Sequence, residues 1–204
     1  MKRAIMGVCV ICVLLGSAGV MYAAEIHEAA KSGDIVKLKA LLDKDSGLLY
    51  SKDELGKTPL HWAVGRGQLE VIKVLLDTYK ADVNVRNDNQ GTPLHVAASQ
   101  AQPEAAKILL AHHALVDART KNNSTPLHFA AFKGKKAGHI ETAKILVNNG
   151  ADINAKNDSG ATPLSMAVFR SNSEIIDLLR AAGAQAGPSV KAGKNDRGSV
   201  WEDE

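Results

Sequence analysis

Apolar residues recur in pairs of short runs along most of the chain. In the longer run of each pair, residues such as Leu69, Ile72 and Leu75 lie three or four positions apart, which is typical of one face of a helix. The shorter run precedes it and begins with Thr-Pro-Leu. Polar stretches rich in Asn, Asp and Gly separate the pairs and favour tight turns. The pattern predicts an all-α fold of short helices.

The Thr-Pro-Leu segments begin at Thr58, Thr92, Thr125 and Thr162, which are 34, 33 and 37 residues apart. Thr is a good N-cap residue, and Pro suits the first helical position because its φ is already set and it has no N–H to leave unpaired. We therefore expect each segment to open a helix with its Leu in the core. A period of this length is typical of stacked helical units.

These segments resemble ankyrin repeats, through TPLHxAA, a second helix ending in LL or LV, and GADIN at Gly150–Asn154. Residues 26–42 are similar to a first unit without Thr-Pro. The resemblance implies an all-α solenoid of about five helix-turn-helix units joined by β-hairpin-like fingers. The expected domains are a signal peptide at 1–24, an ankyrin-repeat domain at 25–186 and a disordered tail at 187–204. The expected units are 25–57, 58–91, 92–124, 125–161 and 162–186.

Three departures from the repeat predict local differences in structure. Residues 77–82 are one residue longer than their counterparts and lack Gly, and His113 stands where a Gly is expected, so these helix ends should be strained or differently shaped. Residues 132–139 contain about four extra positions, with glycines on either side of a lysine pair. We expect this insertion in a helix-helix turn, on the surface.

The N-terminal segment reads as a secretory signal peptide. Lys2 and Arg3 are followed by an uncharged apolar run, residues 4–20, and by small residues at Ala23 and Ala24. This predicts a periplasmic protein. An uncleaved membrane anchor and a secreted protein are the alternatives. Both cysteines lie in this segment, so the exported chain can form no disulfide.

Charge and motifs argue against several functions. Removing the leader leaves 23 basic and 22 acidic residues, a balance that disfavours nucleic acid or an anionic membrane as partner. The resemblance implies structural histidines at 61, 95 and 128, each bonded to the Thr of its own motif and to the adjacent linker backbone. His112, His113 and His139 are interpreted as surface residues rather than metal ligands. We expect no catalytic residue, cofactor or metal, with an enzyme or metal-binding protein as the remote alternative.

The resemblance implies a binding module whose partner meets the fingers and the exposed ends of the first helices. The candidate contact residues are Glu54, Arg66, Asp88, Asn89, Gln100, Lys121, Asn122, Phe132, Lys133, Lys135, Lys136, Asp158, Phe169 and Arg170. We expect a monomer that activates, scaffolds or protects an exported enzyme. Inhibition of a toxic enzyme, as by an immunity protein, is the alternative.

Phe132 and Phe169 occupy the same slot in successive units, so their rings should lie side by side, flanked by Lys133 and Arg170. Two interpretations follow: a binding hot spot, or rings that fold down over a neighbouring helix. Phe129 and Trp62, in a slot usually filled by Leu, are expected to pack between repeats.

Overall fold

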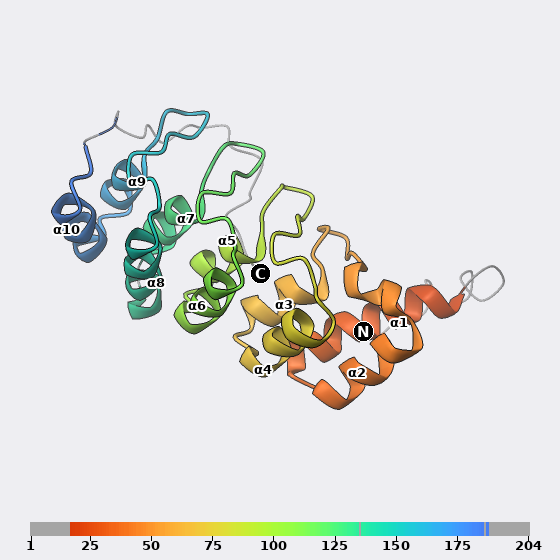
Figure 1. The fold of residues 1–204 in the computed structure, drawn as a ribbon. Helices are drawn as coiled ribbons and strands as arrows, with labels where there is room; N and C mark the ends of the chain where they lie inside the picture. The colour runs from red at the N-terminus through yellow and green to blue at the C-terminus, as the bar shows by residue number, and fades with distance from the viewer. Residues whose placement is uncertain (1–16, 135, 186, 188–204) are drawn as a thin grey trace, which may run out of the picture.

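The computed structural model describes residues 17–134, 136–185 and 187, and this part of the chain forms five helix pairs stacked in a curved row (Figure 1). No strand occurs in it, so the expected all-α solenoid is confirmed. The first helices are α1 (Ser17–Ser32), α3 (Pro59–Gly65), α5 (Pro93–Ser99), α7 (Pro126–Lys133) and α9 (Pro163–Phe169). The second helices are α2 (Ile35–Lys44), α4 (Leu69–Lys73), α6 (Pro103–Ala111), α8 (Ala137–Asn148) and α10 (Ser173–Ala181).

The N-terminal and C-terminal predictions fall mostly beyond the described residues. Positions 1–16 of the predicted signal peptide and 188–204 of the predicted tail lie outside them, and α1 begins at Ser17 and continues past Ala24. Within the described ranges, no helix is both long and apolar enough to cross a bilayer.

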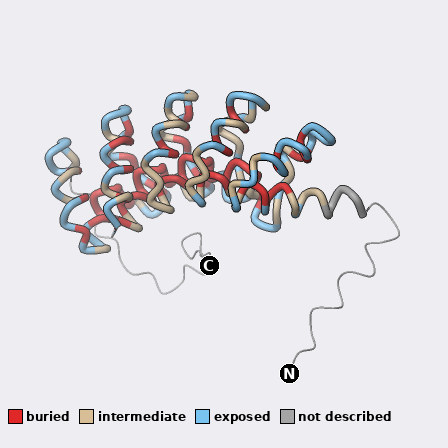
Figure 2. Tube along the Cα trace, turned by 90° about the horizontal axis from the view of Figure 1, so that it is seen from below, coloured by how far each residue is buried: buried red, intermediate tan, exposed pale blue. Residues whose placement is uncertain are grey.

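The core runs as one continuous band through the stack (Figure 2). The Leu of each Thr-Pro-Leu segment is buried as expected, and small residues one turn later, such as Ala97 and Ala130, have no exposed surface. Each first helix contacts the first helices of the neighbouring units, and α4, α6, α8 and α10 contact one another in sequence. Small side chains let these helices approach closely, so every unit buries its apolar face against the next.

Fingers project from one edge of the stack between helix pairs (Figure 1). Each is a tight turn closed by a backbone hydrogen bond, as from the Asn87 N–H to the Gly91 carbonyl at 3.0 Å. Adjacent fingers are also joined: the Lys121 N–H donates to the Asn89 carbonyl, also at 3.0 Å, and the Asp158 N–H donates to the Asn122 carbonyl at 3.1 Å. The fingers therefore form one connected platform.

Two irregular helix ends agree with the sequence. Lys80 and His113 adopt φ values of 54° and 65°, in the left-handed region that Gly150 occupies at 82°. A residue with a Cβ is strained there. The extra residue before Lys80 is accommodated by a π-helical turn, η2 (Val74–Thr78), which continues α4. A 3₁₀ turn, η1 (Ser46–Tyr50), follows α2.

The insertion lies at the junction of α7 and α8, but the prediction of a longer surface turn is wrong. The turn has three residues, 134–136, as between α5 and α6, and the extra positions extend α7 to 8 and α8 to 12 residues. Both ends of the inserted segment are buried. Gly134 is buried, and His139 is only 5% exposed. A Cβ on Gly138 would lie 2.5 Å from the Ala101 carbonyl oxygen of the preceding unit. The glycines allow this close approach, so the insertion is wedged between its neighbours. Lys136 is exposed, and Lys135 lies outside the described residues.

Candidate functional site

The repeated histidines form a ladder inside the stack. His95 Nδ1 accepts a hydrogen bond from the Thr92 N–H at 3.1 Å, and its Nε2 lies 3.2 Å from the carbonyl of Ser124 in the next finger. Because Nδ1 accepts, the ring proton is on Nε2, which donates to that carbonyl. His61 and His128 make the equivalent bonds to Gly91 and Ala161. The expected structural role is confirmed.

Burial lowers the pKa of His61 and of His95 to about 4, because removal from water disfavours the charged ring. The pKa of His128 is lowered for the same reason. These rings stay neutral near pH 7, with both nitrogens engaged by the protein. Their hydrogen bonds join neighbouring units, so they are not candidates for proton transfer or metal binding.

A second ladder joins the helix-helix turns. Gln68 Nε2 donates to the Lys31 carbonyl at 2.9 Å, and Gln102 Nε2 donates to the Gly65 carbonyl at 3.3 Å. In the unit with the insertion, His139 takes this role, with Nε2 2.9 Å from the Ser99 carbonyl. The final rung runs from Asn172 to the Gly134 carbonyl. His139 directly precedes Ile140-Glu141 as Gln68 precedes Leu69-Glu70, so it occupies the same position relative to the second helix and makes the equivalent bond.

The interpretation of His139 as a surface residue is therefore wrong. His112 is partly exposed and lies 3.3 Å from Asp77, while His113 is exposed. No cluster of three His, Cys, Asp or Glu residues suited to a metal ion occurs in the described ranges. The sequence signal for the second ladder is the recurrence of Gln before the second helix, at Gln68 and Gln102.

The candidate contact residues lie in the fingers and at the ends of the first helices, except that Lys136 directly precedes α8. The exposed candidates are Glu54, Arg66, Asp88, Asn89, Lys121, Lys136, Asp158 and Phe169. Those that are partly buried are Gln100, Asn122, Phe132, Lys133 and Arg170. Apart from Lys135, which lies outside the described residues, each candidate side chain thus has some surface open to solvent.

The two phenylalanines lie side by side as expected. Their ring centroids are 6.5 Å apart with an interplanar angle of 10°, and the Arg170 guanidinium lies 4.7 Å from the Phe132 centroid. Phe132 is partly buried against the core, whereas Phe169 is 42% exposed beside Val168, which is 51% exposed. Phe132 thus covers the core, as the second interpretation expects, whereas Phe169 faces outward.

A cationic cluster surrounds Trp62. Lys31 Nζ lies 4.1 Å from the ring centroid, Lys57 Nζ 4.7 Å and the Arg66 guanidinium carbon 6.0 Å. The indole N–H donates to Asp53 at 2.9 Å. Trp62 is partly exposed, so the expectation of packing between repeats describes it incompletely. The clue in the sequence is that Lys57 and Arg66 lie a few positions before and after Trp62.

Phe129, in the same slot as Trp62, does pack between repeats. It is 5% exposed, and its ring stands edge-on to His95 with centroids 5.3 Å apart. The prediction for Phe129 is confirmed.

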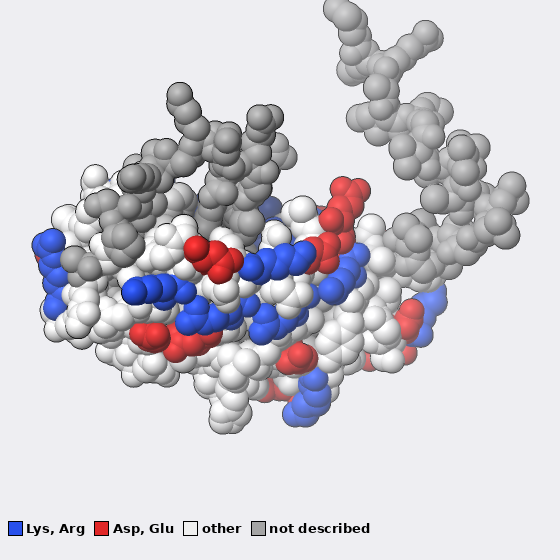
Figure 3. Space-filling view, turned by 90° about the horizontal axis from the view of Figure 1, so that it is seen from above, with Lys and Arg blue, Asp and Glu red and all other residues white. Residues whose placement is uncertain are grey.

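Charge is unevenly divided between the two sides of the stack. We define the finger face as residues 51–57, 85–91, 118–124 and 155–161 with the first-helix ends 31–32, 65–66, 99–100, 132–133 and 169–170. It carries ten Lys and Arg against four Asp and Glu. The second-helix side, residues 34–46, 68–82, 102–117, 136–152 and 172–185, carries nine against twelve. Figure 3 looks onto the fingers and shows a band of basic side chains there. The near-neutral total conceals this division.

A protein-family model described as ankyrin repeats (3 copies) matches residues 25–87, 79–157 and 114–189. These stretches overlap and together cover most of the chain. No curated protein is similar enough in sequence to count as a match.

Proposed function

The chain belongs to the ankyrin-repeat family, and from that premise we propose that it is a non-catalytic module that binds a partner protein on its finger face. Ankyrin repeats generally serve protein interaction. The observation that carries the proposal is the aromatic pair at the ends of α7 and α9: Phe169 is 42% exposed, and its ring is parallel to that of Phe132.

Several features of this patch favour a binding hot spot. Phe169 and Val168 are large apolar residues exposed side by side, and Arg170 lies directly beside them. Aromatic and Arg side chains are enriched among residues that dominate binding energy. The patch also stands on helix ends braced by the buried ladders, so a partner has little ordering entropy to overcome.

We propose that the partner is an exported enzyme in the periplasm, which the protein activates, scaffolds or protects. This rests on the charge and apolar pattern of residues 1–24. Fractionating host cells and measuring the mass of the protein in each fraction tests it. A periplasmic form that begins after Ala23 or Ala24 supports the proposal, while a full-length form in the membrane fraction contradicts it.

The binding surface is tested by cross-linking in the host, followed by purification of the tagged protein. The test variant is Phe132→Ala with Phe169→Ala. The matched control is Val36→Ala with Leu115→Ala, because those side chains are 81% and 55% exposed but lie outside the finger face. We expect one protein to co-purify with wild type and control and to be lost from the test variant.

Folding of each variant is checked by its urea midpoint, so that loss of binding is not confused with loss of structure. A partner retained by the aromatic variant, or lost equally from the control, overturns the proposed surface. Assaying the identified enzyme with and without this protein then separates a helper from the alternative, an inhibitor or immunity protein.

A further inference from the structure

We propose that the finger face recognises an acidic, extended segment of the partner protein, with carboxylates bound along a row of cations at the base of the fingers. The inference rests on the proposed function and adds the chemistry of the partner. The row consists of one basic residue at the same position in each finger, namely Lys52, Arg86, Arg119 and Lys156.

The cations of the row are exposed and have no acidic partner among the described residues. All four are exposed, and none makes an ion pair within 4.0 Å in the described part of the chain. On the second-helix side, by contrast, Lys73 and Lys107 each pair with a Glu at 2.7 Å. Lys73 and Lys107 are thus paired with neighbouring carboxylates, whereas the four cations of the row are open to a ligand.

Two of the cations are also held in place. Arg86 Nη1 donates to the Arg119 carbonyl at 2.9 Å, and Arg119 Nη1 donates to the Lys156 carbonyl at 3.0 Å. These bonds fix each guanidinium across two neighbouring fingers and use only one of its terminal nitrogens. The other N–H groups make no hydrogen bond among the described residues, and a guanidinium fork suits a carboxylate. The row is therefore pre-organised to bind carboxylates.

The charge continues beyond the row to both ends of the finger face. Lys31, Lys57 and Arg66 surround Trp62 at one end, and Arg170 lies over Phe132 at the other. Each cluster combines cations with an aromatic ring. A partner segment that intersperses acidic with apolar residues matches this arrangement. A nucleic acid matches it less well, because Glu54, Asp88 and Asp158 at the fingertips would repel the phosphates all along its backbone.

Spacing sharpens the proposal. Packed helices lie about 10 Å apart, so successive cations of the row are separated by about that distance. A chain extended as polyproline II advances about 3.1 Å per residue with three residues per turn, so every third side chain lies on the same face. A segment lying along the row therefore places a carboxylate opposite each cation when Asp or Glu occurs about every third residue.

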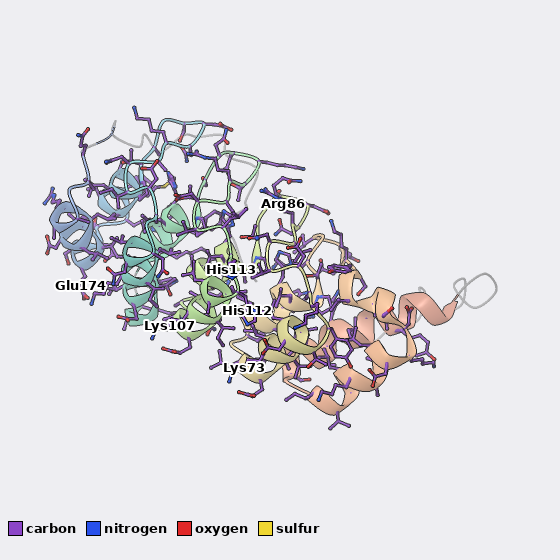
Figure 4. All side chains as sticks on the ribbon, viewed as in Figure 1. Lys73, Arg86, Lys107, His112, His113 and Glu174 are labelled. Carbon is purple, nitrogen blue, oxygen red and sulfur yellow. The ribbon has the colours of Figure 1, made fainter. Side chains whose placement is uncertain are left out.

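The full chain is titrated into a fluorescein-labelled peptide of about 15 residues with Glu at every third position and Ser or Gly between, and anisotropy is recorded. The test variant is Arg86→Gln with Arg119→Gln. Its control is Lys73→Gln with Lys107→Gln, which removes the same charge from the second-helix side; Figure 4 shows Lys73 and Lys107 on the second helices and Arg86 on a finger. We expect at least ten-fold weaker binding for the test variant and no change for the control.

A second variant keeps the test valid if loss of the arginines loosens the fingers. Lys52→Gln with Lys156→Gln removes two side-chain charges whose Nζ atoms make no hydrogen bond within the described residues, so the interfinger bonds remain. We expect this variant to weaken binding as well, and we expect raised salt to weaken binding to wild type, because it screens exposed charges.

Several results overturn the inference. These are absence of peptide binding at low salt, equal affinity for a peptide with Gln in place of Glu, and an equal loss in the Lys73/Lys107 control. Tighter binding of single-stranded DNA of the same charge would assign the row to nucleic acid. Tighter peptide binding by a chain ending at Gly187 would indicate that its own acidic residues 202–204 occupy the row. A partner captured through Phe169 but indifferent to all charge variants would reject this inference and leave the proposed function standing.

Discussion

Each repeat contributes one set of residues to the packing between units, here called the stacking side, and another set to the finger face. The two sets follow different rules. On the stacking side, His61, His95 and His128 each bond the next finger's backbone in the same way. At one finger position, by contrast, the charge changes along the chain from Asp88 to Lys121. Stacking requires uniform geometry, so its residues recur, whereas the finger face, apart from its recurring row of cations, is free to vary with the partner. Substitutions should therefore affect stability on the first side and binding on the second.

Acid should produce the largest effect, and on the stacking side. The pKa of His61 and of His95 is about 4 in the folded protein, whereas a histidine in the unfolded chain has a pKa of 6.5. Between these values the unfolded chain binds more protons, so stability is complete above about pH 6.5 and falls as the pH drops towards 4. Each ring accounts for a loss of about 3 kcal/mol. Urea unfolding at pH 7 and pH 4 measures the loss.

Carboxylates also titrate in this range, so the contribution of one ring needs a variant. His95→Ser removes the titrating group, and the difference in stability between pH 7 and pH 4 should shrink by about 3 kcal/mol. An unchanged difference would contradict the account of this buried histidine.

Next in size is the cost of His95→Ser at pH 7. In the last unit, Ser165 Oγ accepts from the Thr162 N–H at 2.8 Å, so Ser can cap the helix. It does not replace the bond to the Ser124 carbonyl or the volume of the ring, and we expect a loss of about 2–3 kcal/mol. Lys121→Ser on the finger face should change the free energy of unfolding by less than about 0.5 kcal/mol. Similar losses in the two variants would remove the distinction between the two sides.

Glycine substitutions separate packing from backbone strain. Gly138→Ala places a Cβ 2.5 Å from the Ala101 carbonyl, and we expect a loss of about 2 kcal/mol. Gly150→Ala meets nothing within 4 Å but keeps a φ of 82°, so the loss should be about 1 kcal/mol. Thermal melts of both variants measure this order. The reverse order would contradict the wedged insertion.

The smallest effect is a gain. His113 adopts a φ of 65° and its side chain is exposed. His113→Gly relieves the strain and should raise the free energy of unfolding by about 0.5 kcal/mol, after the entropy cost of Gly in the unfolded chain. A loss of stability in urea would show that the imidazole ring makes a contribution greater than the strain.

The helix pairs, the capped Thr-Pro-Leu helices and the stacked phenylalanines could be predicted because each repeats or recurs at a fixed spacing. The role of His139 was missed because positions were counted from Thr125, which displaces it by four; counted from the second helix, His139 aligns with Gln68 and Gln102. The division of charge was also missed, since counting Lys and Arg over the whole chain discards their position. Folding brings residues such as Arg86 and Arg119, 33 positions apart, into one row.

The most direct test of the finger face is a calorimetric titration of the purified partner against three proteins: wild type, Phe132→Ala with Phe169→Ala, and Val36→Ala with Leu115→Ala. Loss of Phe169, an exposed anchor worth about 2 kcal/mol at a hot spot, predicts about thirty-fold weaker binding for the aromatic variant. The control should bind as wild type does. Equal affinity of the partner for wild type and the aromatic variant would contradict the account.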